Sequence, residues 1–166
     1  MPLAAEYTLR PYREGDASHI AAIMQSAILT IGPRAYSAEQ VEAWTARAFT
    51  VERVTERVAL GHQITVTVDA PDIPVAYALL ERDGHLDHLY CDPNHTRRGL
   101  AEALLANAEK DARALGCQRL YTEASELARP VFERAGYRVT KRRDFTITHE
   151  GREVPIHNFA MEKTLD

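Results

Sequence analysis

A basic turn just past the middle of the chain has the composition of a phosphate-binding site. Arg97, Arg98 and Gly99 lie between an apolar, strand-like run and a long helical pattern. The first N–H groups of a helix have no partner within it, and the helix dipole adds positive character at that end. Together with the two arginines, these N–H groups suit a ligand that carries phosphate. Gly99 has no Cβ, so we expect it to let the backbone come close to that ligand.

Two common phosphate-binding motifs are excluded by the residues around this turn. A P-loop needs Gly-Lys-Ser or Gly-Lys-Thr at the start of the helix, and the chain contains neither. A dinucleotide-binding fold needs two more glycines, and its turn follows the first strand of the domain. Here the turn comes after what reads as an antiparallel meander, so another class of phosphate ligand is indicated.

Hydrophobic periodicity and turn residues predict the elements that must position this turn. Asp16, a capping box at residues 37–40 and Ser125 are the expected N-terminal caps of three helices. The Asp-Gly pair at residues 83–84 is expected to turn a hairpin, and Gly116 to end the long helix. The expected strands are residues 7–13, 63–68, 75–82, 85–91, 117–124, 137–148 and 154–163, and the expected helices are residues 16–31, 37–48, 51–58, 99–115 and 125–134.

Length, charge and cysteine usage narrow the class of protein. A chain of 166 residues suits one domain with a sizeable core, spanning residues 1–166. The formal net charge of −4 gives no general attraction to nucleic acid or to an anionic membrane, and no apolar run is long enough to span one. The N-terminus lacks the features of a secretory signal. Cys91 and Cys117 have no metal-ligand spacing, so we expect reduced thiols, no metal and a cytoplasmic protein.

The basic turn resembles the acyl-CoA pyrophosphate loop of the GNAT-type N-acetyltransferases. That family's pattern is Gln or Arg, two residues, Gly, one residue, then Gly or Ala. This chain has the run Thr96-Arg97-Arg98-Gly99-Leu100-Ala101. The likeness holds at Gly99 and Ala101, with arginine at position 98 as the family often has, and it departs at Thr96.

Other parts of the chain extend the resemblance. The expected order of elements agrees with that of the family from end to end. Residues 128–137 contain the aromatic, glycine and aromatic pattern with which the family closes its fourth helix. Residues 36–44 and 122–125 resemble an uncharacterised bacterial subgroup of these acetyltransferases. The likeness therefore covers essentially the whole chain.

The resemblance implies an α/β (α+β) architecture, the GNAT fold. In this fold about four helices flank a mixed central sheet of about six to seven strands. The first half of the sheet is antiparallel, and the fourth and fifth strands form a parallel pair that splays apart. The strand, helix and strand of residues 85–124 predict the same parallel pair, joined by a right-handed crossover.

The resemblance also implies acetyl-CoA as the cosubstrate and assigns residues to it. Backbone groups of Leu89, Tyr90 and Cys91 would hold the pantetheine arm, where the fourth strand splays from the fifth. Ser125 either bonds the pantetheine or only caps its helix. The N–H groups that would hold the pyrophosphate belong to Arg97, Arg98, Gly99, Leu100 and Ala101.

Four residues are candidates for the base that takes a proton from the amine. Family members often place a carboxylate on the fourth strand, several residues before the splay. Counting back from the loop puts His85 near that position, with Asp87 on the same face and His88 on the opposite one. An imidazole titrates near neutral pH, but a buried acid on a strand needs a reason, which favours Asp87 slightly. Asp87 could equally orient His88 or bind the acceptor's ammonium. Glu123, at the end of the fifth strand, is the fourth candidate.

The general acid departs from the family's pattern. Many members use a tyrosine on the helix after the fifth strand, where this chain has Phe132. Tyr90, Tyr121 or Tyr137 could replace it, although each could also be a core residue. A free thiolate is a tolerable leaving group, so an acid is not required.

The leading hypothesis is a transferase that moves an acetyl group from acetyl-CoA to a primary amine of a small molecule or protein, in a ternary complex. The acceptor site would be walled by Tyr36, Trp44, His157 and Asn158. The first alternative is a sensor of the same fold that binds acyl-CoA without turnover, and the second is an unrelated nucleotide-binding α/β domain. We expect no nucleic-acid or membrane partner, and the last strands could support a homodimer.

Overall fold

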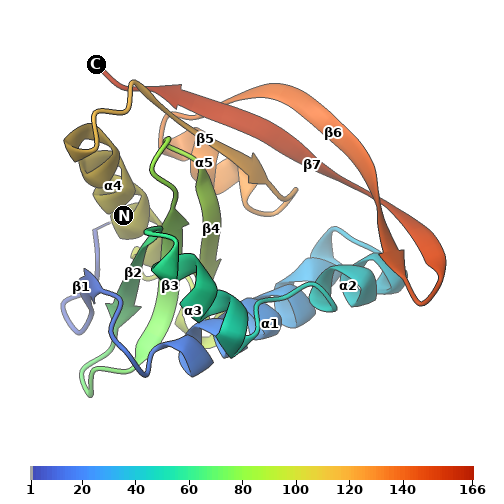
Figure 1. Ribbon diagram of the computed structural model, residues 1–166, viewed down its shortest axis with the longest axis horizontal. Coiled ribbons are helices and arrows are strands. Elements are labelled where there is room, and N and C mark those ends of the chain that lie inside the picture. The colour runs from blue at the N-terminus through green and yellow to red at the C-terminus, as the bar shows by residue number, and fades with distance from the viewer. Residues whose placement is uncertain (1) are drawn as a thin grey trace.

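The computed structural model describes residues 2–166, and its elements follow the order predicted from the sequence (Figure 1). The strands are β1 (Thr8–Pro11), β2 (Gln63–Val68), β3 (Pro74–Leu80), β4 (Leu86–Cys91), β5 (Arg119–Ala124), β6 (Arg138–His149) and β7 (Arg152–Thr164). The α-helices are α1 (Ala17–Ile31), α2 (Ala38–Thr45), α3 (Val51–Ala59), α4 (Leu100–Ala114) and α5 (Arg129–Arg134), and the 3-10 turns are η1 (Gly32–Arg34) and η2 (Pro93–His95). None of the helices described is long and apolar enough to cross a membrane.

The strands form two antiparallel sheets instead of the single mixed sheet that the sequence predicted. Their orders are β1-β2-β3-β4 and β5-β7-β6. Within residues 2–166, β4 and β5 are linked by one parallel bridge, between His85, just before β4, and Tyr121 of β5. Just past it, the Thr122 hydroxyl donates to the Leu86 carbonyl at 2.7 Å, so a side chain replaces the next ladder bond. The predicted parallel pair is therefore reduced to a bridge, and the two strands diverge beyond it.

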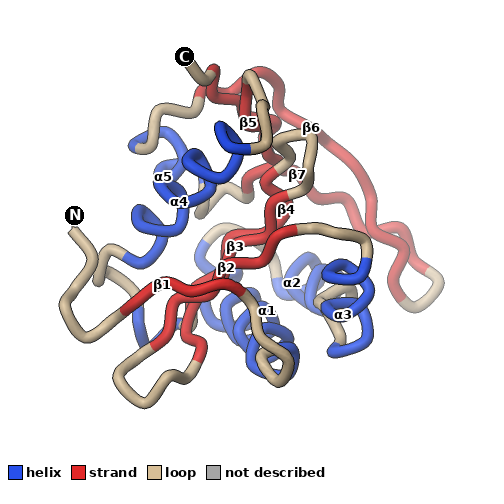
Figure 2. The backbone as a smooth tube through the Cα atoms, turned by 60° about the vertical axis from the view of Figure 1, so that its left-hand side comes forward, coloured by secondary structure: helices blue, strands red, loops and turns tan. Residues whose placement is uncertain are grey.

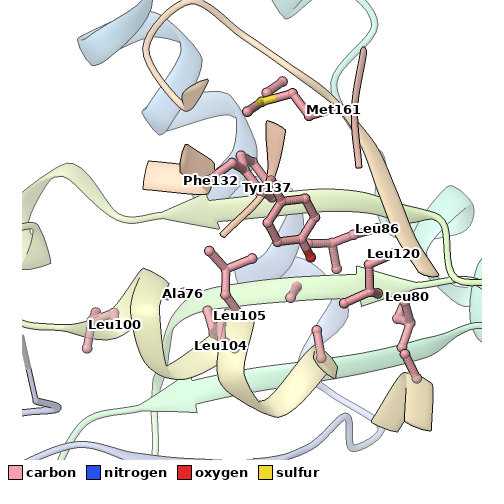
Figure 3. Close-up of a cluster of buried hydrophobic side chains, with 14 of the residues drawn as sticks. Ala76, Leu80, Leu86, Leu100, Leu104, Leu105, Leu120, Phe132, Tyr137 and Met161 are labelled. Carbon is pink, nitrogen blue, oxygen red and sulfur yellow. The ribbon is translucent and has the colours of Figure 1, made fainter. Parts of the chain in front are cut away.

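Two hydrophobic cores lie on opposite faces of the first sheet, with α4 over one face and α1 to α3 over the other (Figure 2). β3 is buried along its whole length because alternate side chains enter different cores. Ala76 and Leu80 pack with Leu104 and Leu105 of α4 (Figure 3), whereas Tyr77 packs with the helices of the other face.

The long β6–β7 hairpin joins the two cores. On β7, Val154 and Ile156 belong to the core of α1 to α3, whereas Phe159 and Met161 belong to the core of α4 and α5. The strand therefore passes from one core to the other near residues 157–158. Polar side chains can be placed at that crossing without entering either core.

Most of the predicted turns and caps are confirmed. Ser37 and Gln40 form the predicted capping box of α2, and Gly84 turns the hairpin with a φ of 97°. The expectation for Asp16 is wrong, because its side chain makes no capping bond to α1. Its carboxylate instead pairs with Arg10 at 2.8 Å and accepts from the backbone N–H of Arg13. The Asp16 side chain is therefore used in an ion pair and not in a helix cap.

Candidate active site

Two neighbouring cavities open where β4 and β5 diverge. The larger has a volume of about 320 Å³ and the smaller of about 170 Å³. Both are lined by Trp44, Leu89, Tyr90, Ser125 and Ala128. The divergence of the strands thus creates one cleft with two compartments and a shared wall.

The smaller cavity is apolar and runs toward the start of α4. Its walls come from the end of α1, from β4, from α4 and from the segment before α5. Leu89, Tyr90 and Cys91, the residues that the sequence assigned to a pantetheine arm, all line it, and so does Ala101. Burial raises the pKa of Cys91 to about 12, so this thiol stays protonated and unreactive at neutral pH.

The loop before α4 offers a run of backbone donors. Within residues 2–166, no hydrogen bond engages the backbone N–H groups of residues 97–102. Arg97 and Gly99 have left-handed conformations, with φ of 60° and 79°. Such turns gather successive N–H groups into a concave anion site, and the dipole of α4 adds to its positive character. This arrangement fits a pyrophosphate.

Gly99 also has a structural role that the sequence did not predict. A Cβ at this position would overlap the carbonyl oxygen of Pro2, and Ala4 donates its N–H to the carbonyl of Arg98 at 3.2 Å. The missing side chain therefore makes room for the N-terminal segment. The positive φ is a second, independent reason for glycine.

The two arginines of the loop differ in their freedom. Arg98 donates to the hydroxyl of Tyr7 at 2.8 Å and lies 3.8 Å from Glu6. Arg97 is exposed and has no ion pair with any residue that the structure describes. Arg98 thus braces the loop against the N-terminal segment, while Arg97 remains available to an anion.

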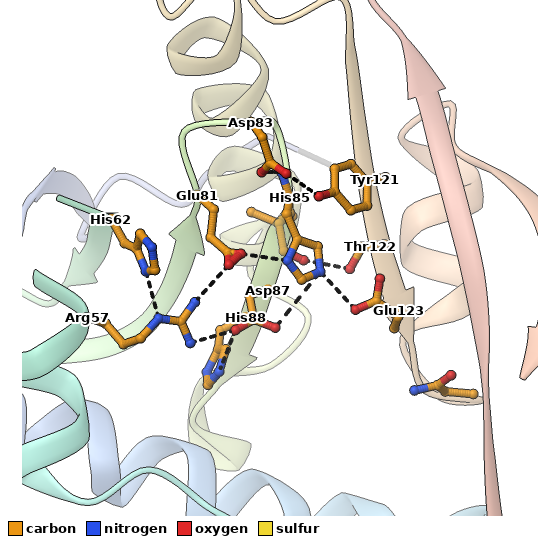
Figure 4. Close-up of polar contacts among 12 residues, drawn as sticks. Arg57, His62, Glu81, Asp83, His85, Asp87, His88, Tyr121, Thr122 and Glu123 are labelled. Atoms are coloured by element: carbon orange, nitrogen blue, oxygen red, sulfur yellow. Dashed lines mark hydrogen bonds and ion pairs between the residues drawn. The ribbon is translucent and has the colours of Figure 1, made fainter. Parts of the chain in front are cut away.

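The larger cavity has a polar end on β4 and β5, where Asp87 and Glu123 reach its wall (Figure 4). Behind them His85 lies between two carboxylates. Its Nδ1 is 2.7 Å from Glu81, its Nε2 is 2.8 Å from Glu123, and its ring stacks on Tyr121 at 4.7 Å. Asp87 lies 4.0 Å from His85 and 3.6 Å from His88, so all four candidate bases form one connected cluster.

His85 is held as a cation. Burial opposes its charge, but hydrogen bonds to Glu123 and Glu81 outweigh burial and raise its pKa to about 9. At neutral pH both ring nitrogens carry protons, so His85 has no lone pair with which to take a proton from an amine. The sequence left His85 open as a base, and this geometry speaks against it.

Asp87 is the carboxylate best placed to act at the cavity. Burial opposes its ionisation, but the hydrogen bond from Arg57 and the positive charges of Arg57 and His85 outweigh burial and lower its pKa. The Arg57 guanidinium binds one oxygen, Oδ2, at 2.7 Å. Asp87 is therefore an anion at neutral pH, with its other oxygen turned toward His85 at 4.0 Å.

His88 is neutral and structural. Its ring is buried, lies 4.0 Å from that of Phe49, and has a pKa that burial lowers to about 4. The Tyr77 hydroxyl lies 2.8 Å from Nδ1. Because burial raises the pKa of Tyr77 well above its usual value, we assign Tyr77 as the donor, which leaves the ring proton on Nε2. That nitrogen is 3.6 Å from Asp87, close enough to help orient the acid.

Among the tyrosines considered as proton donors, only Tyr90 reaches the shared wall of the two cavities. Burial raises its pKa, so its hydroxyl is protonated at neutral pH. Tyr121 donates to Asp83 outside the cavities, and Tyr137 is packed edge-on against Phe132 in the core, at 5.0 Å. Phe132 lines the larger cavity but has no proton to give.

Ser125 keeps both of the functions considered for it. Its hydroxyl oxygen accepts the N–H of Ala128 at 3.1 Å, as a cap would. The residue also lines both cavities. The hydroxyl proton has no acceptor among the described residues, so it is free to donate to a ligand.

Sequence reasoning missed three residues of the site. Arg57 and Glu81 complete the charged cluster, and Arg143 lines the larger cavity. Arg57 reaches Asp87 from a helix thirty residues earlier in the chain. No local pattern marks such a contact, because an arginine on an amphipathic helix is by default a solvated residue.

Comparisons with known proteins agree with this geometry. A family model described as an acetyltransferase (GNAT) domain matches residues 33–151. The chain is 31% identical over 133 residues to the uncharacterised N-acetyltransferase YafP of Escherichia coli (strain K12), which covers 80% of this chain and 82% of YafP.

Solved structures are similar over nearly the whole chain. A GCN5-related N-acetyltransferase from Rhodopseudomonas palustris has a TM-score of 0.86 and 31% identity, covering 99% of each chain. YncA from Salmonella typhimurium, solved with its cofactor acetyl-CoA, has a TM-score of 0.72 and 20% identity, covering 97% of this chain and 95% of YncA. At 20% identity, the similarity to YncA shows a shared fold alone.

Proposed function

Because this chain belongs to the GNAT family of acetyltransferases and is an acetyl-CoA-dependent acyltransferase, we propose that it acetylates a primary amine of a small molecule or protein by direct transfer in a ternary complex. Acetyl-CoA brings the acetyl group as a thioester, which is already activated toward an amine. The protein then has to align the two substrates, accept a proton from the amine and stabilise the departing thiolate.

The observation that carries this proposal is the pair of cavities with a shared wall. An apolar compartment leads to free backbone donors at the start of α4, and a polar compartment holds an ionised carboxylate. Leu89, Tyr90 and Ser125 border both. A thioester held at that wall would face an amine in the larger cavity. Both cores contribute to the cleft, which supports a single domain.

The cosubstrate would be held mainly by backbone groups. The N–H groups of residues 97–102 and the side chain of Arg97 would bind the pyrophosphate. Leu89, Tyr90 and Cys91 would line the pantetheine arm, with the Ser125 hydroxyl as an extra donor. Backbone donors fixed by a helix cost no side-chain entropy on binding, which suits a cosubstrate common to the family.

We assign proton acceptance to Asp87. A primary ammonium has a pKa of about 10 and must lose a proton before it can attack. The Asp87 carboxylate attracts the ammonium, and a water between them would pass a proton from the ammonium to the carboxylate, which leaves the amine with the lone pair that attacks the thioester. Arg57 and His88 fix the orientation of the acid. Glu123, bound to the cationic His85, would add negative charge at the same end of the cavity.

Tyr90 would stabilise the departing thiolate. Its hydroxyl stays protonated because burial raises its pKa, and it lies at the wall that both cavities share. A hydrogen bond from this hydroxyl to the sulfur would stabilise the negative charge that develops there. It takes the role that a tyrosine at position 132 would have in many relatives, where this chain has Phe132.

Acetyl-CoA titrations with a charge-reversal at the start of α4 test the proposal. Ala101→Glu puts a carboxylate in the first helical turn, where it suits the helix dipole but repels a pyrophosphate. We expect micromolar binding by the wild type and binding weakened by about tenfold or more in the variant. Ala106→Glu, at an exposed position of the same helix, is the matched control and should bind like the wild type.

The same protein is then assayed for thiol release with a broad panel of amines. Turnover with any of them, abolished in Ala101→Glu at low acetyl-CoA, supports the transferase. Micromolar binding with no turnover of any amine would favour the acyl-CoA sensor instead. Absence of acetyl-CoA binding by the wild type would overturn both.

A further inference from the structure

The larger cavity has a second charged end that the proposed transfer does not use. Arg143 and Arg47 line it together with Asn158. These residues come from β6, from the segment after α2 and from β7, whereas the carboxylates come from β4 and β5. One cavity thus holds anionic and cationic groups on different elements.

The register of the second sheet puts these groups on one face. Glu123 pairs with Ala160, and Arg143 pairs with Asn158, two residues further along β7. Alternate residues of a strand share a face, so Glu123, Asn158 and Arg143 all point to the same side of the sheet. Two strand spacings and two residues along the strand separate the Cα atoms of Glu123 and Arg143 by roughly 12 Å. The long side chains span part of that distance, which leaves room for a small ligand between them.

Arg143 is oriented but not neutralised. Its guanidinium donates to Oδ1 of Asn158 at 3.1 Å and lies over the ring of Phe145 at 5.4 Å. Within residues 2–166, neither Arg143 nor Arg47 has a carboxylate within 4.0 Å. The neighbouring Arg142, on the other face of β6, is paired with Asp144 at 3.1 Å. Because Arg143 is half-buried, an unmatched charge there has a cost unless a ligand supplies the partner.

We propose that the acceptor is a small amine that also carries an oxyanion, a carboxylate or a phosphate, bound by Arg143 and assisted by Arg47 and the amide of Asn158. This inference rests on the proposed transfer, because it places the amine at Asp87 and Glu123. A guanidinium binds either oxyanion through two parallel N–H bonds. The two charged ends then fix which way round the acceptor enters, with its amine toward the shared wall of the cavities.

Binding of two-ended probes to the protein saturated with CoA tests this substrate class. The probes are 3-aminopropylphosphonate and 4-aminobutanoate, each compared with propylamine by calorimetry. We expect at least one of the two to bind about tenfold tighter than propylamine or better, because it adds a charge-assisted pair. The phosphonate and carboxylate arms distinguish the two oxyanions.

Three variants sharpen the result. Arg143→Gln should remove the advantage of the two-ended probe, and Arg143→Lys should restore part of it. Arg142→Gln, the same change one residue away on the opposite face, should have no effect. Equal affinity of all probes for the wild type, or an advantage that survives in Arg143→Gln, would overturn the proposal.

Turnover and cosubstrate binding separate this inference from the proposed function. With acetyl-CoA, glucosamine 6-phosphate and the standard amino acids are compared with glucosamine and the amino-acid amides. Faster turnover of glucosamine 6-phosphate or of the amino acids, with an advantage that is lost in Arg143→Gln, supports the inference. Faster turnover of glucosamine or the amino-acid amides, which lack the oxyanion, would overturn the oxyanion site but leave the transferase proposal intact. Weaker CoA binding by Arg143→Gln with unchanged acceptor kinetics would overturn the oxyanion site in the same way. Lack of acetyl-CoA binding would be a failure of the proposed function itself.

Discussion

The two compartments of the cleft are built in opposite ways. The smaller one is apolar, ends at backbone donors, and takes most of its assigned contacts from one stretch of chain, residues 89–101. The larger one is lined by charged side chains from elements that are distant in sequence, including β4, β5 and β6. The first depends on backbone conformation, and the second depends on charges that balance one another across the fold.

This difference explains why one compartment is general and the other specific. A backbone site of unpaired N–H groups recognises phosphate whatever the neighbouring side chains are. A site of matched side-chain charges changes its ligand whenever one charge changes. We therefore expect changes in the larger compartment to alter acceptor kinetics without altering acetyl-CoA affinity, and the predictions below test that separation.

The largest expected effect is on the turnover of Asp87→Asn. Losing the carboxylate removes the proton acceptor, so kcat should fall by about a hundredfold or more while the Kd for acetyl-CoA stays unchanged. Asp144→Asn, which removes another arginine-paired acid outside both cavities, is the control and should keep full activity. If acetyl-CoA binding falls in parallel with kcat in Asp87→Asn, the two compartments are not independent.

The same contrast decides how much of the molecule could be predicted from its sequence. The capping box at Ser37, the turn at Gly84 and the loop at residues 97–101 are local, so residue type and spacing were enough to predict them. The residues of that loop alone predicted a phosphate-bearing ligand, and acetyl-CoA was implied by the resemblance of the loop and of the element order to the GNAT family. The divergence of β4 from β5 depends on Thr122 and Leu86, which are 36 residues apart. Asp16 pairs with Arg10, only six residues away, but Arg10 belongs to β1 and not to the helix, so the helix-capping pattern did not predict this contact.

The charged compartment was the least predictable part for the same reason. Asp87 and His85 could be named as candidates, but their protonation depends on Arg57 and Glu123, which only the fold brings to them. Spacing along a strand tells which face a side chain is on. It does not tell which charge meets it there.

A second prediction concerns stability, because the charged cluster should make it depend on pH. The pKa of His85 is about 9 in the folded protein against 6.5 without its partners. The stabilisation from its charge is therefore fully present below pH 6.5 and is lost as pH rises through 9. Its size is at most about 3 kcal/mol.

Chemical denaturation of the wild type and His85→Gln at pH 6, 8 and 10 measures this contribution. The difference in unfolding free energy between the two proteins should be largest at pH 6 and shrink toward pH 10. His149→Gln serves as a control, because this histidine has exposed partners at the tip of the last hairpin. A wild-type advantage that is constant from pH 6 to pH 10 would mean that His85 stabilises the fold through its ring stacking on Tyr121 and not through its charge.

The smallest predicted effect isolates the backbone of the other compartment. Gly99 and Gly116, at the two ends of α4, have nearly the same φ, 79° and 81°. Alanine at either position is strained by about 1 kcal/mol because of that φ. At Gly116 the new Cβ meets nothing within 4 Å, whereas at Gly99 it overlaps the carbonyl oxygen of Pro2. Gly99→Ala should therefore destabilise the protein more than Gly116→Ala, by about 1 kcal/mol further.

Deleting residues 1–3 separates the two sources of strain in Gly99→Ala, the positive φ and the overlap with Pro2. Without Pro2 the overlap is gone, so Gly99→Ala in the shortened chain should cost no more than Gly116→Ala does. Any loss of acetyl-CoA affinity in Gly99→Ala should be reversed along with the loss of stability, if the N-terminal segment is the only obstacle to a side chain there. If affinity stays low while stability recovers, the Cβ meets the ligand after all, and the glycine serves the cosubstrate as well as the fold.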